Sequence, residues 1–542
     1  MLALQAPKAT MRSNGMRDDR YVLAIDMGSS SVKATLVSQR GELAGTGLRN
    51  VDILLLPGGG AEQDPEQWWD AAISAAKSAL ATAAIPPERI VAVACTTQWA
   101  VTVPVDKGGH AIWNALSWMD TRGGRYSRAA VDGWPKIEGY AVYKLLKWVR
   151  LTGAAPNHSG VDGFGHILYF KHERPDLYAR TYKFLEPMDY LNFRLTGRCA
   201  ASYSTIFPYW LTDNRNPNHI DYHPGLLRAA GIERSKMPDL RPVDAVLGEL
   251  KPQVAAELGL LPGTRVVMGS GDSQAATVGA GCVRDYDGYF CIGTTAWLSC
   301  HVPWKKTDVA HSLATMPAAL PGRYMVSAEQ GTAGRCLEFL KNNILFPVNG
   351  QKPAEGDLYG ILNAEAAQVE AGSEGLIFTP WINGVLAPRE DHYTRSAFFN
   401  QTARTTRAHY VRAVMEGVAF NLRWLKGHVE KFIGRPFAQL NFIGGGATSQ
   451  VWCQIQADIL GCPVRRIANA RSANAVGAAL AAFSALGEIR VEDIAQIVQV
   501  AETYQPQEKH RRVYDEQFRE FLEFYRRMRP IYRRLNPVIH PV

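Results

Sequence analysis

The chain has 542 residues, of which 46% are apolar and 20% charged, and its formal net charge is +8. This length exceeds what one hydrophobic core usually organises, so two or more domains are expected. Because 59 basic residues only slightly outnumber 51 acidic ones, a nucleic-acid-binding surface is not expected, and a shell that attracts small phosphorylated molecules explains the charge equally well. No apolar stretch is as long as the roughly 18 to 20 residues that span a bilayer, so no membrane association is expected.

Eight cysteines are scattered among apolar residues, without a CxxC pair or histidines at ligand spacing. This usage is typical of reduced core cysteines in a cytoplasmic protein and predicts neither disulfides nor a cysteine metal site. Residues 1–20 lack the apolar core of a secretory signal and resemble a transit peptide only faintly. They predict a disordered tail, with Met16 as an alternative start.

The predicted elements begin with a strand-turn-strand unit from Tyr21, composed of YVLAID, MGSSS and VKATLV. A helix follows over DPEQWWDAAISAAKSALA, with Asp64 as its N-cap and Pro65 at its first position. Next come the strand IVAVAC, a region of mixed helices and loops from about 125 to 240, and the extended segment TRVVMGSGD from residue 264.

A second strand-turn-strand unit, DGYFCIGTTAWLSCHV, spans residues 287–302. Then LNFIGGGATSQVWCQIQADIL predicts a short strand, three glycines and a helix with Ser449 as its N-cap. PVRRI predicts another strand, NAVGAALAAFSALG a small-residue helix that packs closely, and the end of the chain a helix with an aromatic stripe. Because the strand-turn-strand unit occurs twice, we expect two related α/β domains that face each other.

Asp26 ends the first predicted strand, just before Gly28 and a run of serines. Its carboxylate would therefore lie at the sheet edge where open α/β sheets bind ligands. The small residues let backbone N–H groups approach phosphate oxygens, and Lys33 could add positive charge. An ordinary hairpin turn, in which the aspartate bonds its own backbone, is the alternative interpretation.

Asp272 follows a second apolar strand and precedes a small-residue helix. It is either a helix N-cap or a general base that accepts a proton from a substrate hydroxyl. IGTTA at 292–296 is another turn able to hold phosphate, and GGGATS at 444–449 leaves room for a flat ring against bare backbone. Neither a P-loop nor a dinucleotide fingerprint is present.

The order of these segments resembles the FGGY family of carbohydrate kinases, most closely its xylulokinase-like members, from about Tyr21 to the C-terminal helix. The resemblance includes AEQDPEQWW at 61–69, SWMDTR at 117–122, EPMDYLNFRLTG at 186–197 and RAVMEGVAFNLR at 412–423. It implies an α/β fold of two ribonuclease-H-like domains of the actin and hexokinase type, over 21–261 and 262–542, that face an interdomain cleft.

The resemblance also implies an activity and its residues: ATP-dependent phosphorylation of a small sugar or polyol, with ATP and Mg²⁺ as cofactors. Asp272 would be the catalytic base, and Asp26 would hold Mg²⁺ through water, with Asp272 as the other carboxylate near the metal. ATP and its phosphates would contact Gly28, Ser29, Ser30, Ser31, Lys33, Gly293, Thr294, Thr295, Gly445, Gly446 and Ser449. The acceptor would contact Gln98, Trp99, Asp120 and Asp272. A cytoplasmic enzyme, and a homodimer, are further expectations.

Departures from the family pattern cluster at positions that are expected to bind the acceptor. Xylulokinases carry Met-His, and glycerol kinases Arg-Glu, where this chain has Trp99 and Ala100. The family's Gly-Glu-Arg-Thr-Pro is GVLAP at 384–388, and its lysine before Asp-Tyr-Leu is Met188. D-xylulose or a related ketose is the expected acceptor, with a tetritol or glycerol as alternatives.

Other interpretations of these residues remain. Trp99 either offers an aromatic face to the acceptor or belongs to the core, and Asp120 either binds a hydroxyl or pairs with Arg122. At the level of the whole protein, the alternatives are a non-catalytic sugar- or nucleotide-binding regulator and an ATPase resembling actin. Asp26 and Asp272 argue against the regulator, and SWMDTR argues against the ATPase.

Overall fold

The computed structural model describes residues 19–345 and 358–536. Of the predicted tail at 1–20, residues 1–18 lie outside the described residues. Asp19 and Arg20 are in place: Asp19 pairs with Arg40 across 3.1 Å, and Arg20 pairs with Glu488. The predicted disordered tail is therefore wrong at these two positions.

The first sheet has six strands in the order β16-β17-β6-β1-β2-β3. The predicted hairpin is confirmed, because β1 and β2 are antiparallel and are joined by a short turn. β3 extends the sheet antiparallel to β2, while β6 and β17 run parallel to β1 on its other side. The strands are β1 (Tyr21–Met27), β2 (Ser31–Ser38), β3 (Leu43–Asn50), β6 (Ile90–Thr97), β16 (Val246–Glu249) and β17 (Arg265–Val267).

The second sheet has nine strands and contains the same five-strand arrangement. β18 and β19 form the second predicted hairpin, β22 lies antiparallel to β19, and β26 and β27 run parallel to β18. Its strands are β18 (Gly288–Ile292), β19 (Ala296–Val302), β20 (Thr307–Asp308), β21 (Leu313–Pro317), β22 (Tyr324–Ser327), β23 (Glu329–Gln330), β26 (Leu440–Ile443), β27 (Val464–Ile467) and β28 (Val500–Tyr504). Because the order β22-β19-β18-β26-β27 repeats β3-β2-β1-β6-β17, the two domains are related, as predicted.

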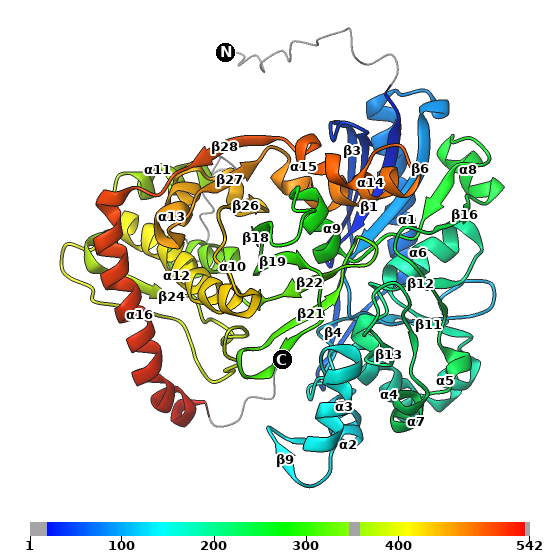
Figure 1. The fold of residues 1–542 in the computed structure, drawn as a ribbon, viewed down its shortest axis with the longest axis horizontal. Helices are drawn as coiled ribbons and strands as arrows, with labels where there is room; N and C mark the ends of the chain where they lie inside the picture. The colour runs from blue at the N-terminus through cyan, green and yellow to red at the C-terminus, as the bar shows by residue number, and fades with distance from the viewer. Residues whose placement is uncertain (1–18, 346–357, 537–542) are drawn as a thin grey trace.

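Alternation along the strands divides the core into layers, because successive side chains point to opposite faces of a sheet. In the first sheet, Leu23 and Ile25 pack toward α1 (Pro65–Ala83), whereas Val22 and Ala24 pack toward α9 (Asp272–Gly279) and α14 (Ala473–Ala485). Figure 1 shows α9 and α14 between the two sheets.

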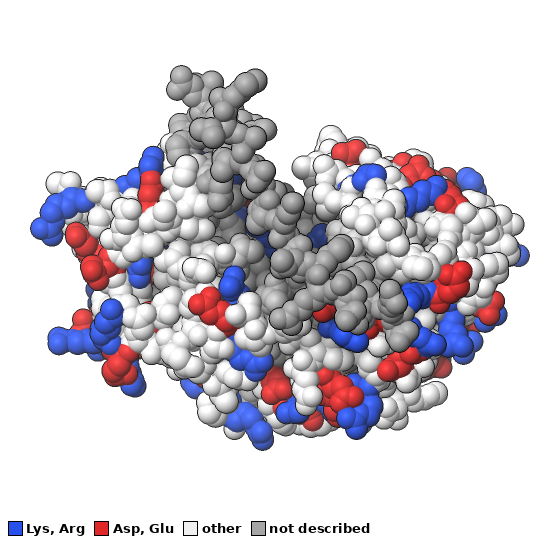
Figure 2. All heavy atoms as spheres, turned by 90° about the horizontal axis from the view of Figure 1, so that it is seen from above, with Lys and Arg blue, Asp and Glu red and all other residues white. Residues whose placement is uncertain are grey.

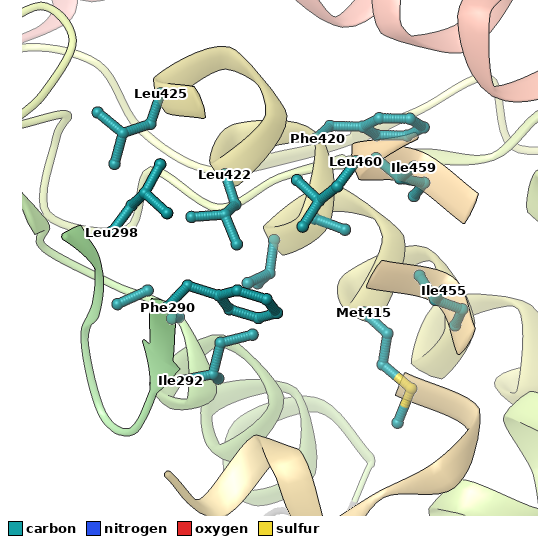
Figure 3. Close-up of a cluster of buried hydrophobic side chains, with 14 of the residues drawn as sticks. Phe290, Ile292, Leu298, Met415, Phe420, Leu422, Leu425, Ile455, Ile459 and Leu460 are labelled. Atoms are coloured by element: carbon teal, nitrogen blue, oxygen red, sulfur yellow. The ribbon is translucent and has the colours of Figure 1, made fainter. Parts of the chain in front are cut away.

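The outer layer of the second domain is formed by α12 (Arg407–Ile433) and α13 (Gln450–Leu460). Phe290 and Ile292 of β18 pack against side chains of these helices, among them Met415 and Ile455 (Figure 3). Tyr289 and Cys291, the alternate residues of β18, face the α9 and α14 layer instead.

Glycines allow α9 and α14 to approach each other closely. A Cβ at Gly279 would lie 1.8 Å from the carbonyl oxygen of Ala473, and one at Gly477 would lie 1.9 Å from that of Ala275. No larger residue is tolerated at such distances without moving a helix. The predicted close packing is therefore present, and it fixes the helix that begins with Asp272.

Both predicted caps are found. Asp64 accepts a hydrogen bond from the backbone N–H of Glu66, ahead of Pro65, and Ser449 accepts one from Trp452. The domain boundary expected after residue 261 needs correction, because β17 at Arg265–Val267 pairs with β6 in the first sheet. A strand after position 261 thus completes the first domain.

The remaining elements form an insertion beside the first sheet and the ends of the second domain. The other α-helices are α2 (Gly124–Val131), α3 (Val142–Thr152), α4 (Gly163–Glu173), α5 (Pro175–Arg180), α6 (Pro187–Thr196), α7 (Pro224–Ala230), α8 (Pro252–Leu258), α10 (Gly334–Phe339), α11 (Leu358–Ala367), α15 (Ile494–Ile497) and α16 (Glu508–Leu535). Short strands are β4 (Leu54–Leu56), β5 (Gly60–Gln63), β7 (Val103–Val105), β8 (Ala115–Leu116), β9 (Lys136–Ile137), β10 (Tyr140–Ala141), β11 (Lys183–Leu185), β12 (Ala200–Ser202), β13 (Thr212–Asp213), β14 (Asp221–Tyr222), β15 (Asp239–Arg241), β24 (Ile377–Thr379) and β25 (Ala397–Phe399).

Two general properties of the molecule bear on its partners. Among the described helices, none combines the length and the apolar character needed to cross a bilayer. On the face seen in Figure 2, basic and acidic side chains are interspersed.

Candidate active site

The hairpin β1–β2 presents Asp26 at the edge of the first sheet, opposite Lys33 in the strand register. The turn is closed by a hydrogen bond of 2.9 Å from the Gly28 N–H to the Ser31 carbonyl. Asp26 is partly open to solvent and is hydrogen-bonded to the Asn474 side chain at the start of α14. Burial raises the pKa of Asp26 to about 6, although Lys33 and Asn474 oppose the shift.

Lys33 itself is held by the other domain. Its Nζ donates a 3.1 Å hydrogen bond to the backbone carbonyl of Arg471. Ser30, another predicted phosphate-loop residue, holds the start of the next segment, because its carbonyl accepts the Val51 N–H at 3.0 Å. Lys33 and Asn474 therefore both join the first hairpin to the second domain.

Asp272 is the first residue of α9, and Gly271 is its N-cap. The interpretation of Asp272 as the N-cap is therefore wrong. One carboxylate oxygen accepts the Ser273 N–H at 2.6 Å. Burial raises the pKa of Asp272 to about 7, and the negative charges of Asp26 and Glu329 add to the shift. The fold thus brings Asp26 and Asp272 together from segments about 250 residues apart in sequence.

Buried hydroxyl groups hold the loop before Asp272. The Ser202 hydroxyl donates to the Gly269 carbonyl at 2.9 Å, and the Ser204 hydroxyl accepts the Gly271 N–H at 3.2 Å. Asp189 in turn holds the segment 202–205 that carries these two serines. Its carboxylate accepts the Ser202 N–H at 3.2 Å and the Thr205 hydroxyl at 2.8 Å. These contacts position the backbone that carries Asp272.

The second hairpin turn, residues 293–295, is supported by the N-terminus of α10. The Gly334 N–H donates to the Gly293 carbonyl at 2.9 Å, and the Ala333 N–H to the Thr294 carbonyl at 3.0 Å. A Cβ at Gly334 would lie 2.3 Å from the Gly293 oxygen, so only glycine permits this approach. Thr294 is exposed and Thr295 half-buried, which leaves both accessible to a ligand.

The glycine-rich segment after β26 presents bare backbone. Gly445 has no atom within 4 Å of an added Cβ, whereas at Gly446 a Cβ would meet Ile292 at 2.8 Å. Ser449 is buried, and its hydroxyl donates to the Asn363 side chain at 2.7 Å while it caps α13. Gly445 is exposed and open to a flat ring, whereas Gly446 is buried against Ile292 and the Ser449 hydroxyl is already engaged.

A hydrogen-bonded chain links the first turn to the predicted acceptor loop. The Gln98 side chain accepts from the Ser29 hydroxyl at 2.7 Å and donates to Gln63 at 2.7 Å. The Trp118 indole N–H donates to the same Ser29 hydroxyl at 3.0 Å, and its side chain is 43% exposed. Trp118 is therefore a solvent-accessible aromatic ring beside the first turn.

Trp99 is half-buried, and its ring is tilted against Phe207 at a centroid distance of 6.2 Å. A Cβ at Gly271 would lie 3.8 Å from the Trp99 Cβ, so the residue also adjoins the Asp272 loop. Ala100 has a positive φ of 60°, and the next N–H, from Val101, donates to buried Glu186 at 3.3 Å. Trp99 is thus partly a core residue and partly a residue of the site.

Asp120 forms the ion pair that was the alternative interpretation. It is fully buried, and its carboxylate accepts from the Arg122 guanidinium at 2.6 Å and from the Ala61 N–H at 2.9 Å. Arg122 also binds Glu62 at 2.6 Å. A direct contact of Asp120 with an acceptor would therefore have to displace these donors.

Sequence reasoning missed several residues around the two aspartates, namely Gln63, Trp118, Trp297 and Glu329. Gln63 and Trp118 lie inside the family-like segments AEQDPEQWW and SWMDTR, and Trp297 is the second residue after the second turn. Glu329 lies in AEQG, which has no pattern that would have identified it.

The protein belongs to a class defined by two facing α/β domains with two neighbouring carboxylates, Asp26 and Asp272, beside phosphate-sized turns. Residues 21–279 match the N-terminal domain, and residues 288–486 the C-terminal domain, of the FGGY family of carbohydrate kinases. These matches cover most of the chain, so it belongs to this family and is a carbohydrate kinase with the two-domain fold of actin and hexokinase.

Relatives within the family differ in acceptor. The chain is 25% identical to a xylulose kinase of Bacillus subtilis over 512 residues, which is 93% of this chain and 97% of that protein. It is 27% identical to an autoinducer-2 kinase of Enterobacter over 519 residues, 93% of this chain and 94% of that protein. The solved gluconate kinase of Lactobacillus acidophilus has the same fold, with a TM-score of 0.82, 20% identity, and coverage of 96% of this chain and 100% of that one.

Proposed function

We propose that the protein transfers the γ-phosphate of ATP to a hydroxyl of a small sugar or polyol, with D-xylulose or a related ketose as the first acceptor to test. The observation that carries this proposal is the proximity of Asp26 and Asp272, each partly open to solvent and each with a raised pKa. A non-catalytic regulator would have no need for two costly carboxylates in this position.

Asp272 serves as the general base in this proposal. With a pKa of about 7, it is ionised in an appreciable fraction of molecules at neutral pH and can take the proton of the attacking hydroxyl. The hydroxyl groups of Ser202 and Ser204 hold the preceding backbone, so the carboxylate needs little rearrangement before the transfer.

The donor set suits Mg²⁺ carried by ATP rather than a metal held by protein alone. Within residues 19–345 and 358–536, no three His, Cys, Asp or Glu side chains converge as a metal site. Mg²⁺ usually binds one or two carboxylates, waters and substrate phosphates. Asp26, through water, and Asp272 would supply such carboxylates, and the bound ion would offset negative charge on the phosphates.

The phosphates of ATP would bind the two hairpin turns, through Gly28, Ser29, Ser30 and Ser31 on one side and Gly293, Thr294 and Thr295 on the other. Gly445 and Gly446 would accommodate the adenine ring. Gln98, Trp99 and Trp118 would contact the acceptor, because Gln98 and Trp118 both bind Ser29 of the first turn and Trp99 adjoins the loop of Asp272.

ADP release with a panel of acceptors tests this function. The panel contains D-xylulose, other ketopentoses, tetritols and glycerol, each with ATP and Mg²⁺. We expect at least one neutral acceptor to stimulate ADP release. Release that is independent of every acceptor would instead indicate an ATPase, and no release at all a regulator.

A further inference from the structure

Glu329 lies on the same face of the second sheet as Trp297, because the two residues are directly opposite each other in the antiparallel pair β23–β19. The Trp297 indole donates to the Tyr289 hydroxyl at 2.9 Å, and that hydroxyl donates to the Ser273 carbonyl at 2.8 Å. This face is therefore directed toward the start of α9. Consistent with this placement, the charge of Glu329 contributes to the raised pKa of Asp272.

The Glu329 carboxylate is free for a ligand. In the part of the chain that the structure describes, it takes part in no hydrogen bond or ion pair, and the side chain is exposed. Its backbone is fixed, since the Glu329 carbonyl accepts the Ala387 N–H at 3.1 Å. A rigid strand thus presents an unpartnered carboxylate beside Asp272.

The guanidinium of Arg122, beside the predicted acceptor residue Asp120, has no free positive charge to offer an acidic acceptor. Arg122 is bound by both Asp120 and Glu62, each at 2.6 Å, so two carboxylates already face one guanidinium. An acidic acceptor would have to compete with them for Arg122.

We propose that Glu329 is a specificity-determining residue that rejects carboxylated acceptors and restricts the enzyme to neutral sugars and polyols. The inference rests on the proposed function, because it takes Asp272 as the group next to the reacting hydroxyl. The hydroxyl groups of a neutral acceptor can donate hydrogen bonds to Glu329. An ionised acceptor carboxylate has no proton to donate, and like charges in a partly desolvated site repel each other.

Pairs of acceptors that differ only in a carboxylate provide the test. D-gluconate is compared with D-glucitol, D-xylonate with xylitol, and D-erythronate with erythritol, and D-xylulose is included as a further neutral acceptor. The specificity constant kcat/KM is measured for the wild type, Glu329→Gln and Glu520→Gln. Glu520 is exposed on α16, so its variant changes the net charge equally at a remote position. Glu329 keeps access to solvent, but the protein packed around it partly desolvates the carboxylate and raises its pKa to about 7, so assays at about pH 8.5 keep it ionised.

For the wild type we expect the neutral member of a pair to be preferred by at least about tenfold in kcat/KM. Glu329→Gln should reduce that preference by about tenfold or more, mainly through a lower KM for the acid, whereas Glu520→Gln should leave it unchanged. Acids used as well as their neutral partners by the wild type, or an unchanged preference in Glu329→Gln, would overturn the inference while leaving the kinase function intact. Absence of any acceptor-dependent ADP release would overturn both.

Discussion

Replacing Ser204 by alanine separates the positioning of Asp272 from its chemistry. Ser204 is 1% exposed, and its hydroxyl accepts the N–H of Gly271, the residue before Asp272, at 3.2 Å. In Ser204→Ala that N–H loses its partner in a buried position, which costs about 1 to 3 kcal/mol of unfolding free energy. Without this hydrogen bond, the backbone at the start of α9 is also less firmly held. A shift of about 1 Å in a reacting group can reduce the rate about 100-fold.

We therefore expect kcat of Ser204→Ala to fall by about 10- to 100-fold, with the KM for ATP nearly unchanged, because the nucleotide contacts that we propose lie elsewhere. Urea unfolding followed by tryptophan fluorescence gives the stability, and steady-state kinetics with a neutral acceptor give kcat. Ser235→Ala is the matched control, because Ser235 is exposed and distant from Gly271 in the chain. A loss of stability with an unchanged kcat would refute the positioning of Asp272 by Ser204.

Three further predictions address the base, the core and the acceptor loop. Burial and the charges of Asp26 and Glu329 raise the pKa of Asp272 to about 7, so kcat/KM should rise with pH as Asp272 ionises. Glu329→Gln removes one of these charges and should move the rise to lower pH. A pH profile that is the same in Glu329→Gln and the wild type would contradict the coupling between the two carboxylates. Gly477→Ala should destabilise the protein by about 1 to 3 kcal/mol in urea unfolding, because the new Cβ would lie 1.9 Å from the Ala275 carbonyl oxygen. The control Gly427→Ala, with no atom within 4 Å of its Cβ, should be neutral or stabilising. Equal effects of the two substitutions would contradict the packing argument. Trp99→Met combined with Ala100→His should increase activity on D-xylulose if this pair alone sets the acceptor. Ala100 already has a φ of 60°, a backbone conformation in which histidine is comparatively frequent, so the backbone gives no added stability cost. No gain in activity would mean that other residues share the choice of acceptor.

Much of the fold could be predicted because its signals are local. The alternation of YVLAID, the caps at Asp64 and Ser449, and the two hairpins depend on neighbouring residues, and the structure confirms each. The domain boundary could not be placed in this way. β17 joins the first sheet through pairing with β6, about 170 residues earlier, and no local pattern encodes such a partner.

The sequence predicts those parts of the candidate site that depend on backbone turns. It predicts less well the parts that depend on which side chains are hydrogen-bonded to each other. Gly28, Gly293 and Gly445 lie in turns that the sequence already indicated. The engagement of Asp120 by Arg122, and of Lys33 by the Arg471 carbonyl, depends on tertiary contacts. Glu329 became visible only through its register with Trp297, which short sequence patterns do not contain.

The central claim, that Asp272 acts as the base in phosphoryl transfer to a small sugar or polyol, is tested most directly with ATP labelled at its γ-phosphate. Labelled sugar phosphate is separated from inorganic phosphate after incubation of the wild type and of Asp272→Asn with each acceptor of the panel, and ATP binding is measured in parallel. The account predicts that the wild type forms labelled sugar phosphate and that Asp272→Asn loses at least about 100-fold of this activity while it still binds ATP. Near-normal transfer by Asp272→Asn, or label released only as inorganic phosphate by the wild type, would contradict it.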